Sequence, residues 1–254
     1  MGSPVPFTNF PIGNIGRNYG TLGAVLFVLA SCGPAPAPVG ISDPNEVANR
    51  AVNSLNTGLD TVLVRPVSQV YGTILPAPVR TGVNNFAENL ETPGDVVNNV
   101  LQGNIGNAGQ NSLRFVVNVV MGIGGVFDAA TALGIPSAQT DFGETLHIWG
   151  APEGNYVVTP VLGPSTERDV VGRIVDMVID PIGAITHKPE STIASGANIA
   201  SKIGDRYKFG NTVDSLLYDS ADGYVQLRQL YLENRRFELG QAASDESFED
   251  PYAE

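Results

Sequence analysis

Apolar residues recur at helical spacing over much of the chain. The first stripe has five members, each four residues after the last: Val47, Ala51, Leu55, Leu59 and Leu63. This spacing puts apolar side chains on one face and predicts an amphipathic helix. Asp43 and Pro44 offer a cap and a proline at the first helical position. Arg65-Pro66 predicts the end of this helix.

Three further helices are predicted from their start and stop signals. Residues 92–95 (TPGD) repeat the cap-and-proline pattern and predict a second helix that ends at Gly103. Residues 103–109 then predict a linker between two helices. Thr166 predicts the start of a third helix, which Pro181 ends. A last helix is expected over residues 224–240, with arginines near its carboxyl end, where cations are favourable.

Residues 112–135 are apolar on nearly all sides, which is typical of a buried or membrane-embedded segment. Arg114, Asn118 and Asp128 would be costly at the centre of a bilayer. Three glycines also interrupt the middle of the segment: Gly122, Gly124 and Gly125. We therefore predict a helix–bend–helix hairpin that enters a membrane from one side and does not cross it.

Residues 149–164 are rich in glycine, proline and β-branched residues, and predict an extended loop that contains one short strand. The remaining signals are helical. The predicted fold is mainly α, with one domain over residues 43–243 and loops of unusual glycine and proline content.

An apolar run at residues 21–30 precedes Ser31-Cys32. As a helix it would rise about 15 Å, half of the roughly 30 Å core of a bilayer, so it predicts a secretory signal over residues 1–31. Residues 29–32 (LASC) resemble the bacterial lipobox, in which the cysteine is acylated after cleavage. We expect Cys32 to carry lipid, and Gly33 after it favours the outer membrane. An ordinary signal followed by a buried cysteine is the alternative.

Residues 32–42 contain a proline at every second position for three steps, which favours extended polyproline II and predicts a tether. The chain has 14 basic and 26 acidic residues, a net charge of −12. An acidic protein has no electrostatic attraction to phosphate backbones, so nucleic acid is not an expected partner. The acidic residues 244–254 predict a disordered tail.

The residues give little support to catalysis. Only two histidines are present, His147 and His187, and the chain has no G-x-S-x-G elbow. Glu144 could pair with His147 on one helical face, although an ordinary hydrogen bond is the simpler interpretation. Residues 122–125 (GIGG) suggest a dinucleotide fingerprint, but Phe127 stands where its third glycine belongs. We expect no cofactor and no metal.

Seven motifs in a fixed order resemble the MlaA/VacJ family of lipoproteins. They are residues 64–67 (VRPV), 75–80 with 84–93 (LPAPVR, NNFAENLETP), 98–103 (NNVLQG), 114–118 (RFVVN), 122–128 (GIGGVFD), 141–146 with 149–150 (DFGETL, WG) and 162–169 (LGPSTERD). The resemblance runs from about residue 45 to 240. Residues 47–50 (VANR) depart from it, because relatives often have an aromatic residue before the Asn-Arg pair.

The resemblance implies an all-α domain that forms a ring around an amphipathic channel in the inner leaflet of the outer membrane. Such proteins remove phospholipids mislocalised in the outer leaflet and pass them to a soluble periplasmic carrier, which maintains lipid asymmetry. They work in complex with trimeric porins. The alternative is a structural lipoprotein that binds a porin or a periplasmic partner and carries no lipid.

Two groups of candidate site residues follow. The hairpin at residues 112–135 is expected near the channel, with its glycines as a flexible turn or gate; its candidates are Phe115, Asn118, Met121, Gly122, Gly124, Gly125 and Phe127. Arg168, Asp169 and Arg228 are candidates for contact with a lipid headgroup or the carrier. The alternatives are a helix cap with an ion pair for Arg168 and Asp169, and ordinary helix packing for Arg228.

Overall fold

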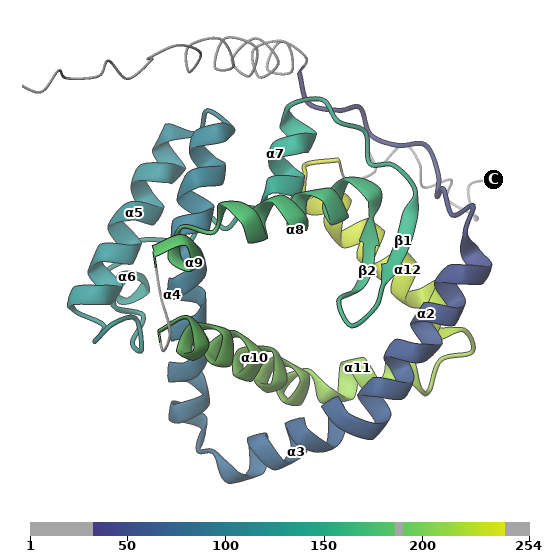
Figure 1. The fold of residues 1–254 in the computed structure, drawn as a ribbon, viewed down its shortest axis with the longest axis horizontal. Helices are drawn as coiled ribbons and strands as arrows, with labels where there is room; N and C mark the ends of the chain where they lie inside the picture. Colours follow the sequence, from purple (N-terminus) through teal and green to yellow (C-terminus); the bar gives the residue numbers. More distant parts are fainter. Residues whose placement is uncertain (1–32, 186–189, 242–254) are drawn as a thin grey trace, which may run out of the picture.

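The structure, a computed structural model, describes residues 33–185 and 190–241. Its helices follow one another around a ring with an open centre (Figure 1). The elements are α2 (Glu46–Leu59), η1 (Asp60–Val64), α3 (Arg65–Ile74), α4 (Ala77–Leu101), α5 (Ile105–Val120), α6 (Ala129–Ala132), α7 (Phe142–Ile148), β1 (Tyr156–Thr159), β2 (Gly163–Thr166), α8 (Glu167–Ile179), α9 (Pro181–Ile185), α10 (Glu190–Lys208), α11 (Gly210–Leu217) and α12 (Gly223–Glu238). The predicted mainly α fold is confirmed. None of the described helices is both long and apolar enough to cross a bilayer.

The opening helix does not end at Pro66, and this prediction is wrong. A π-helical turn, η1, joins α2 to α3, and the N–H of Arg65 donates to the carbonyl of Asp60, five residues back. Pro66 has no N–H and fits next to this widened turn, where the regular i−4 bonding is already interrupted. The predicted cap is also wrong, because the N-cap is Asn45 and the Asp43 carboxylate instead accepts hydrogen bonds from the side chains of Asn49 in α2 and Arg228 in α12.

The second predicted helix is the last part of a longer one. α4 begins at Ala77 after the extended Pro76 and continues through Pro93. The sequence signal at residues 92–95 was overridden by packing, since α4 lies against both α5 and α10 along its length. The predicted stop is confirmed: Gly103 has a φ of 77°, and the N–H of Asn104 donates to the carbonyl of Asn99 at 2.8 Å.

The helix–bend–helix hairpin is confirmed in shape, but α5 begins at Ile105, so most of the linker predicted at residues 103–109 is helical. The bend has positive φ at Ile123, Gly124 and Gly125. Arg114 donates to the Asp128 carboxylate at 3.1 Å, which pairs two charges that the sequence had marked as costly. α5 and α6 lie on the outer side of α4 (Figure 1).

Residues 149–164 contain one strand and the turn to a second, where one short strand was predicted. β1 and β2 form an antiparallel hairpin with Tyr156 opposite Thr166 and Thr159 opposite Gly163. Tyr156 and Val158 of β1 pack with Tyr224 and Leu232 of α12 in a small buried apolar core. The hairpin extends from this core toward the open centre of the ring (Figure 1).

The third and last predicted helices are confirmed. The Thr166 side chain caps α8 by accepting from the N–H of Asp169, and α8 ends at Ile179, ahead of Pro181. α12 ends at Glu238, and Gly240 has a φ of 67°.

The predicted tether differs from a free linker. Ala35 is buried, its N–H donates to the His147 carbonyl at 3.0 Å, and its carbonyl accepts from Gln241 at 2.9 Å. Further along, the N–H of Tyr156 donates to the carbonyl of Ser42 at 2.8 Å. Residues 33–45, which we call the strap, are thus fastened to α7 and β1, and also to α12, where Arg236 donates to the Gly40 carbonyl at 2.8 Å. Three predictions lie outside the described residues, which end at Gln241: the signal at residues 1–31, the lipid at Cys32 and the tail at residues 244–254.

Candidate functional site

The helices around the ring have polar and apolar faces. One face of α8 is buried and contains Arg168, Asp169 and Gly172. Apolar side chains of this helix are exposed instead: Val171 by 50%, Ile174 by 55% and Val178 by 77%. In α10, the apolar residues Ile193 and Ile199 are exposed in the same way. Exposed large apolar side chains on amphipathic helices are typical of surfaces that meet a membrane or a partner.

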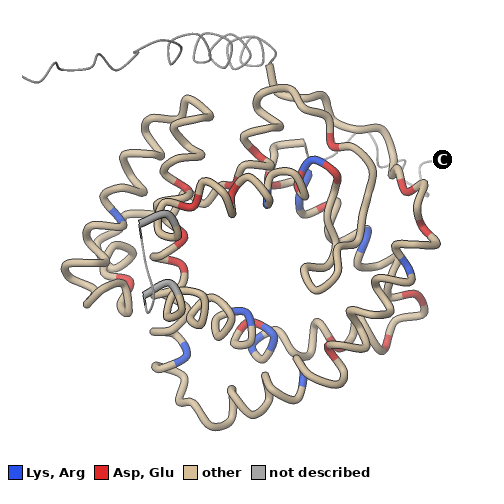
Figure 2. Tube along the Cα trace, viewed as in Figure 1, with Lys and Arg blue, Asp and Glu red and all other residues tan. Residues whose placement is uncertain are grey.

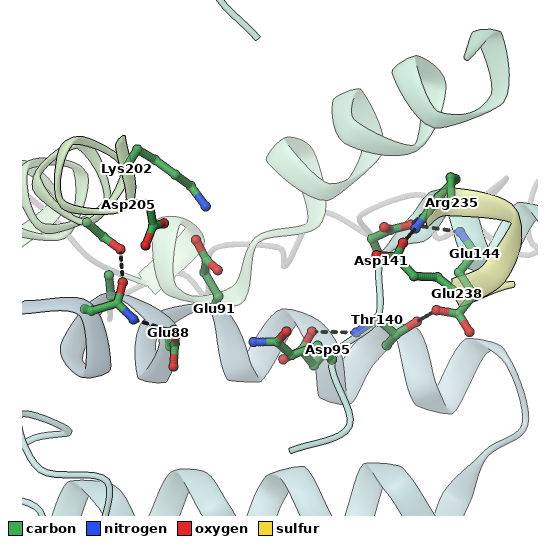
Figure 3. Close-up of a pocket in the computed structure, with 14 residues that line it drawn as sticks. Glu88, Glu91, Asp95, Thr140, Asp141, Glu144, Lys202, Asp205, Arg235 and Glu238 are labelled. Carbon is green, nitrogen blue, oxygen red and sulfur yellow. Dashed lines mark hydrogen bonds and ion pairs between the residues drawn. The ribbon is translucent and has the colours of Figure 1, made fainter. Parts of the chain in front are cut away.

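The polar faces meet in a cavity of about 590 Å³ that α4, α7, α10 and α12 line together. Its lining residues are Asn84, Ala87, Glu88, Glu91, Asp95, Gln139, Thr140, Asp141, Glu144, Ser201, Lys202, Asp205, Arg235 and Glu238. Lys202 and Asp205 of α10 lie across from Glu88 and Glu91 of α4, while Arg235 and Asp141 lie at the other end (Figure 3). Acidic residues also mark the stretch of α4 that borders the open centre (Figure 2).

Helix geometry explains why α4 contributes three carboxylates to one wall. Glu88, Glu91 and Asp95 are spaced by three and four residues, so they share a single face of α4. The same wall continues to Asn98, which donates to the Asp176 carboxylate of α8 at 2.9 Å. The backbone N–H of Thr140 donates to Asp95 at 3.1 Å and fixes the orientation of that carboxyl group.

Carboxyl groups outnumber cations in this cavity, and burial suppresses the ionisation of Asp95 and Glu91. Burial raises the pKa of Asp95 to about 7; the Thr140 N–H bond opposes this, and the nearby Glu91, Asp141 and Asp176 reinforce it. Burial likewise raises the pKa of Glu91, with Lys202 opposing it. The cavity therefore presents carboxyl groups that exchange protons nearer neutrality than ordinary carboxylates do.

An ion-pair cluster stabilises the end of the cavity beside α12. Arg235 donates to Asp141 at 2.7 Å and to Asp169 at 3.2 Å. Tyr231 also donates to Asp169, at 2.7 Å. Burial raises the pKa of Asp169, but Arg235, Tyr231 and Arg168 outweigh it and hold that pKa below its usual value. This cluster fixes α7, α8 and α12 relative to one another, because Asp141 caps α7, Asp169 lies in α8, and Tyr231 and Arg235 lie in α12.

Neighbouring cavities share walls with the first. One of about 420 Å³ shares Asn84, Glu88, Ser201 and Asp205 with it and extends toward Tyr71, Arg80 and Lys208. Another, of about 370 Å³, shares Glu91, Asp95 and Thr140 and adds the apolar side chains of Leu90, Met177 and Ile179. Together they make a row of adjoining hollows along α4 whose walls are mostly polar and are partly apolar beside Leu90, Met177 and Ile179.

The predicted channel residues lie elsewhere. Phe115, Asn118, Met121, Gly122, Gly124, Gly125 and Phe127 belong to α5 and the bend after it, and none lines the cavities described above. Phe127 and Met121 are 59% and 61% exposed. Asn118 has a structural role, because its side-chain oxygen accepts from the N–H of Ala130 at 2.8 Å. A channel or gating role for this hairpin stays a prediction.

The predicted headgroup contacts are buried or paired within the protein. Arg168 and Asp169 are both 4% exposed, and the Thr166 hydroxyl group caps α8 by accepting from the N–H of Asp169 and donates to its carboxylate. Arg168 donates from Nε to Asp169 at 3.4 Å, whereas its Nη1 and Nη2 are buried without a hydrogen-bond partner among the described residues. Arg228 donates to the Asp43 carboxylate. These contacts fit the cap, ion-pair and packing alternatives. Glu144 accepts a hydrogen bond from Thr140, whereas burial, reinforced by Arg168 and Arg235, lowers the pKa of His147.

Sequence reasoning missed Glu88, Glu91, Asp95, Lys202 and Asp205. The spacing of the three α4 carboxylates was visible in the sequence, but the helix boundary predicted at residues 92–95 separated Glu88 and Glu91 from Asp95. A continuous helix through Pro93 would have placed all three on one face.

Comparisons with known proteins agree with this architecture. The chain is 33% identical over 202 residues to an Escherichia coli protein called intermembrane phospholipid transport system lipoprotein MlaA, with 78% of each covered. It is 35% identical over 189 residues to an uncharacterized protein of Rickettsia felis, with 74% of each covered. A solved structure, described as "Structural basis for maintenance of bacterial outer membrane lipid asymmetry", has a TM-score of 0.68 and 30% identity, covering 78% of this chain and 99% of that one. Residues 41–238 match the family described as MlaA lipoprotein, so this chain belongs to the MlaA lipoprotein family.

Proposed function

We propose that the chain is an outer-membrane lipoprotein, acylated at Cys32, that moves mislocalised phospholipids out of the outer leaflet through the ring. The observation that carries the proposal is the pairing of a polar cavity wall with exposed apolar faces on the same ring of helices. The name of the Escherichia coli relative, with its reference to intermembrane phospholipid transport, supports the same class of function.

The physical problem in such transport is the headgroup. A charged or polar group that leaves water for hydrocarbon without partners costs several kcal/mol or more. The cavity wall offers carboxylates at Glu88 and Asp205 and cations at Lys202 and Arg235 as partners along the way. Exposed apolar residues on α5 and α8 would meanwhile seat the ring among acyl chains. Transport of this kind needs no nucleophile, metal or cofactor, and we propose no enzymatic activity.

Two partners complete the proposal. A trimeric porin would hold the ring at the outer membrane, and a soluble periplasmic carrier would receive the phospholipid. A structural lipoprotein that binds the same partners without carrying lipid is the competing function. The cavity favours transport, because an adaptor has no need of a polar hollow lined by partly buried carboxyl groups.

The test converts the polar wall to an apolar one. In a strain that lacks the chromosomal copy, we expect Glu91→Leu with Asp95→Leu to leave phospholipid in the outer leaflet, measured as amine accessible to a membrane-impermeant reagent. Glu233→Leu, at an exposed position of α12, is the matched control and should behave like the natural protein. The copy number of each variant is checked by immunoblot.

A structural role predicts a different result. The double variant would then restore asymmetry as well as the control does, provided that it still copurifies with the porin. Phospholipid bound to the purified protein, measured by mass spectrometry, gives a second readout. We expect it in the natural protein and at a lower level in the double variant.

A further inference from the structure

The tip of the β1–β2 hairpin has a backbone conformation that L-amino acids rarely adopt. Val161 has a φ of 68° and lies between Pro160 and Leu162, and the N–H of Leu162 donates to the Pro160 carbonyl at 2.8 Å. A bond between residues two apart around a positive φ defines the rare, strained form of the γ-turn. A β-branched residue in this region is a true outlier. Strain of this kind is often found where a side chain serves a function.

One side chain of the ring wall holds this turn in place. Asn56 of α2 accepts from the N–H of Val161 at 2.8 Å and donates to the carbonyl of Thr159 at 3.0 Å. These two bonds lie on either side of Pro160, so a single amide satisfies the backbone at both ends of the turn. Within the hairpin, Thr159 also donates from its hydroxyl group to the Gly163 carbonyl at 2.9 Å. The tip is therefore fixed to α2 although its own side chains pack against little.

The side chains at the tip are apolar and exposed. Val161 is 78% exposed and Leu162 is 58% exposed. In the view down the short axis, the hairpin lies within the outline of the ring and points toward its open centre (Figure 1). Charged residues line the cavity along α4 and α10 on another side of that centre. The ring interior thus combines a polar wall with an apolar projection.

We propose that Val161 and Leu162 contact the acyl chains of a phospholipid as it passes through the ring. The inference rests on the proposed function and adds a second contact to it. A phospholipid has a charged headgroup and apolar chains, and the polar wall can satisfy only the headgroup. An apolar tip, held rigidly inside the ring, shields the chains from water while the headgroup follows the carboxylates and Lys202.

The first experiment replaces Val161 with a residue that suits its strained backbone conformation. Asn is among the residues that tolerate positive φ best, so Val161→Asn removes the apolar side chain and relieves the backbone. We expect an unchanged or higher melting temperature together with a roughly tenfold slower clearance of outer-leaflet phospholipid, the factor that corresponds to about 1.4 kcal/mol. Val47→Asn is the matched control, because Val47 is 87% exposed in α2 at ordinary helical φ, and it should clear lipid normally. Normal clearance by Val161→Asn overturns the proposal.

The second experiment locates the lipid. A photo-crosslinking amino acid is placed at position 161, at Met121 of the exposed hairpin, or at the exposed polar Gln229, in full-length protein in cells whose phospholipids carry radioactive phosphorus. We expect labelled adducts at 161 and 121 and none at 229. The adduct at 161, but not that at 121, should decrease when Glu91→Leu and Asp95→Leu are added.

The results distinguish a failure of the acyl-chain contact at the tip from a failure of the proposed transport function. Adducts at 121 without any at 161 overturn the role of the tip and leave the membrane-seated ring standing. An adduct at 161 that the wall variants do not reduce also overturns it, because the tip would then simply touch the surrounding bilayer. The absence of lipid at both positions contradicts the proposed function as a whole.

Discussion

Arg206 of α10 forms a bidentate ion pair with Asp60 in the π-helical turn η1: its Nε and Nη2 each donate to one carboxylate oxygen at 2.8 Å. These residues are 146 positions apart in the chain. Tyr218 of the segment after α11 donates to the same carboxylate at 2.7 Å, and Arg206 also donates to Asp214 of α11 at 2.6 Å. The cluster fastens the opening helices to the closing ones and so completes one side of the ring.

Removing the cation of this cluster should destabilise the ring strongly. Arg206→Leu leaves the Asp60 carboxylate buried without its bidentate partner, and the loss of one member of a buried pair costs about 3–5 kcal/mol. Urea unfolding followed by circular dichroism measures the change. Arg50→Leu breaks the exposed pair with Asp222 and should have a much smaller effect. Equal effects of the two variants would contradict a structural role for the Asp60–Arg206 pair.

Stability should depend on pH through Asp95. Burial raises the pKa of this carboxyl group from 3.8 to about 7, so the folded chain holds a proton there that the unfolded chain releases at lower pH. Its stabilising contribution is therefore fully present below pH 3.8 and declines as the pH rises to about 7. Other carboxylates, such as Asp169, act in the opposite direction because their pKa is lowered.

Asp95→Asn isolates this contribution. The amide keeps an oxygen that can accept from the N–H of Thr140 but cannot ionise. We expect the free energy of unfolding of the variant, relative to the natural protein, to increase steadily between pH 4 and pH 7. A difference that stays constant across this range would show that Asp95 ionises normally.

An added methyl group at the contact between α7 and α8 should destabilise the protein. A Cβ on Gly172 would overlap the backbone of Gly143, so Gly172→Ala must separate the two helices. Overpacking of this kind costs about 1–3 kcal/mol. Gly58→Ala is the matched control: Gly58 lies in α2 with nothing within 4 Å of its Cβ position, and there the change should stabilise by about 0.5–1 kcal/mol. Opposite signs in thermal unfolding are the expected result.

A single substitution can test whether the glycine bend after α5 acts as a gate. A Cβ on Gly122 would meet the Phe127 carbonyl and one on Gly125 the Asn89 side chain, whereas Gly124 has open space around it and a φ of 71°. Gly124→Ala should therefore fold, at a cost of about 1–2 kcal/mol, with a stiffer bend. Slower phospholipid clearance at equal protein level supports a gate; unchanged clearance leaves the bend with a purely structural role.

Local signals in the sequence predicted local structure well. Thr166 with Asp169, Gly103 and Gly240 mark helix ends in the sequence and in the structure, because capping depends on residues within one turn. Pro66 and Pro93 misled the prediction, since a π turn and packing against α5 and α10 outweigh the missing N–H groups. The polar cavity could not be predicted, because its walls come from α4, α7, α10 and α12, and no spacing rule relates side chains so far apart in the chain.

The contacts of the strap limit how far α7 can lie from a lipid anchor at Cys32. Only two residues separate Cys32 from the buried Ala35, and three residue steps span at most about 11 Å. An acylated cysteine at that position would keep the carboxyl end of α7, to which Ala35 is hydrogen-bonded, close to the membrane surface. The anchor would then determine which edge of the ring lies nearest the bilayer, as well as the membrane to which the ring is attached.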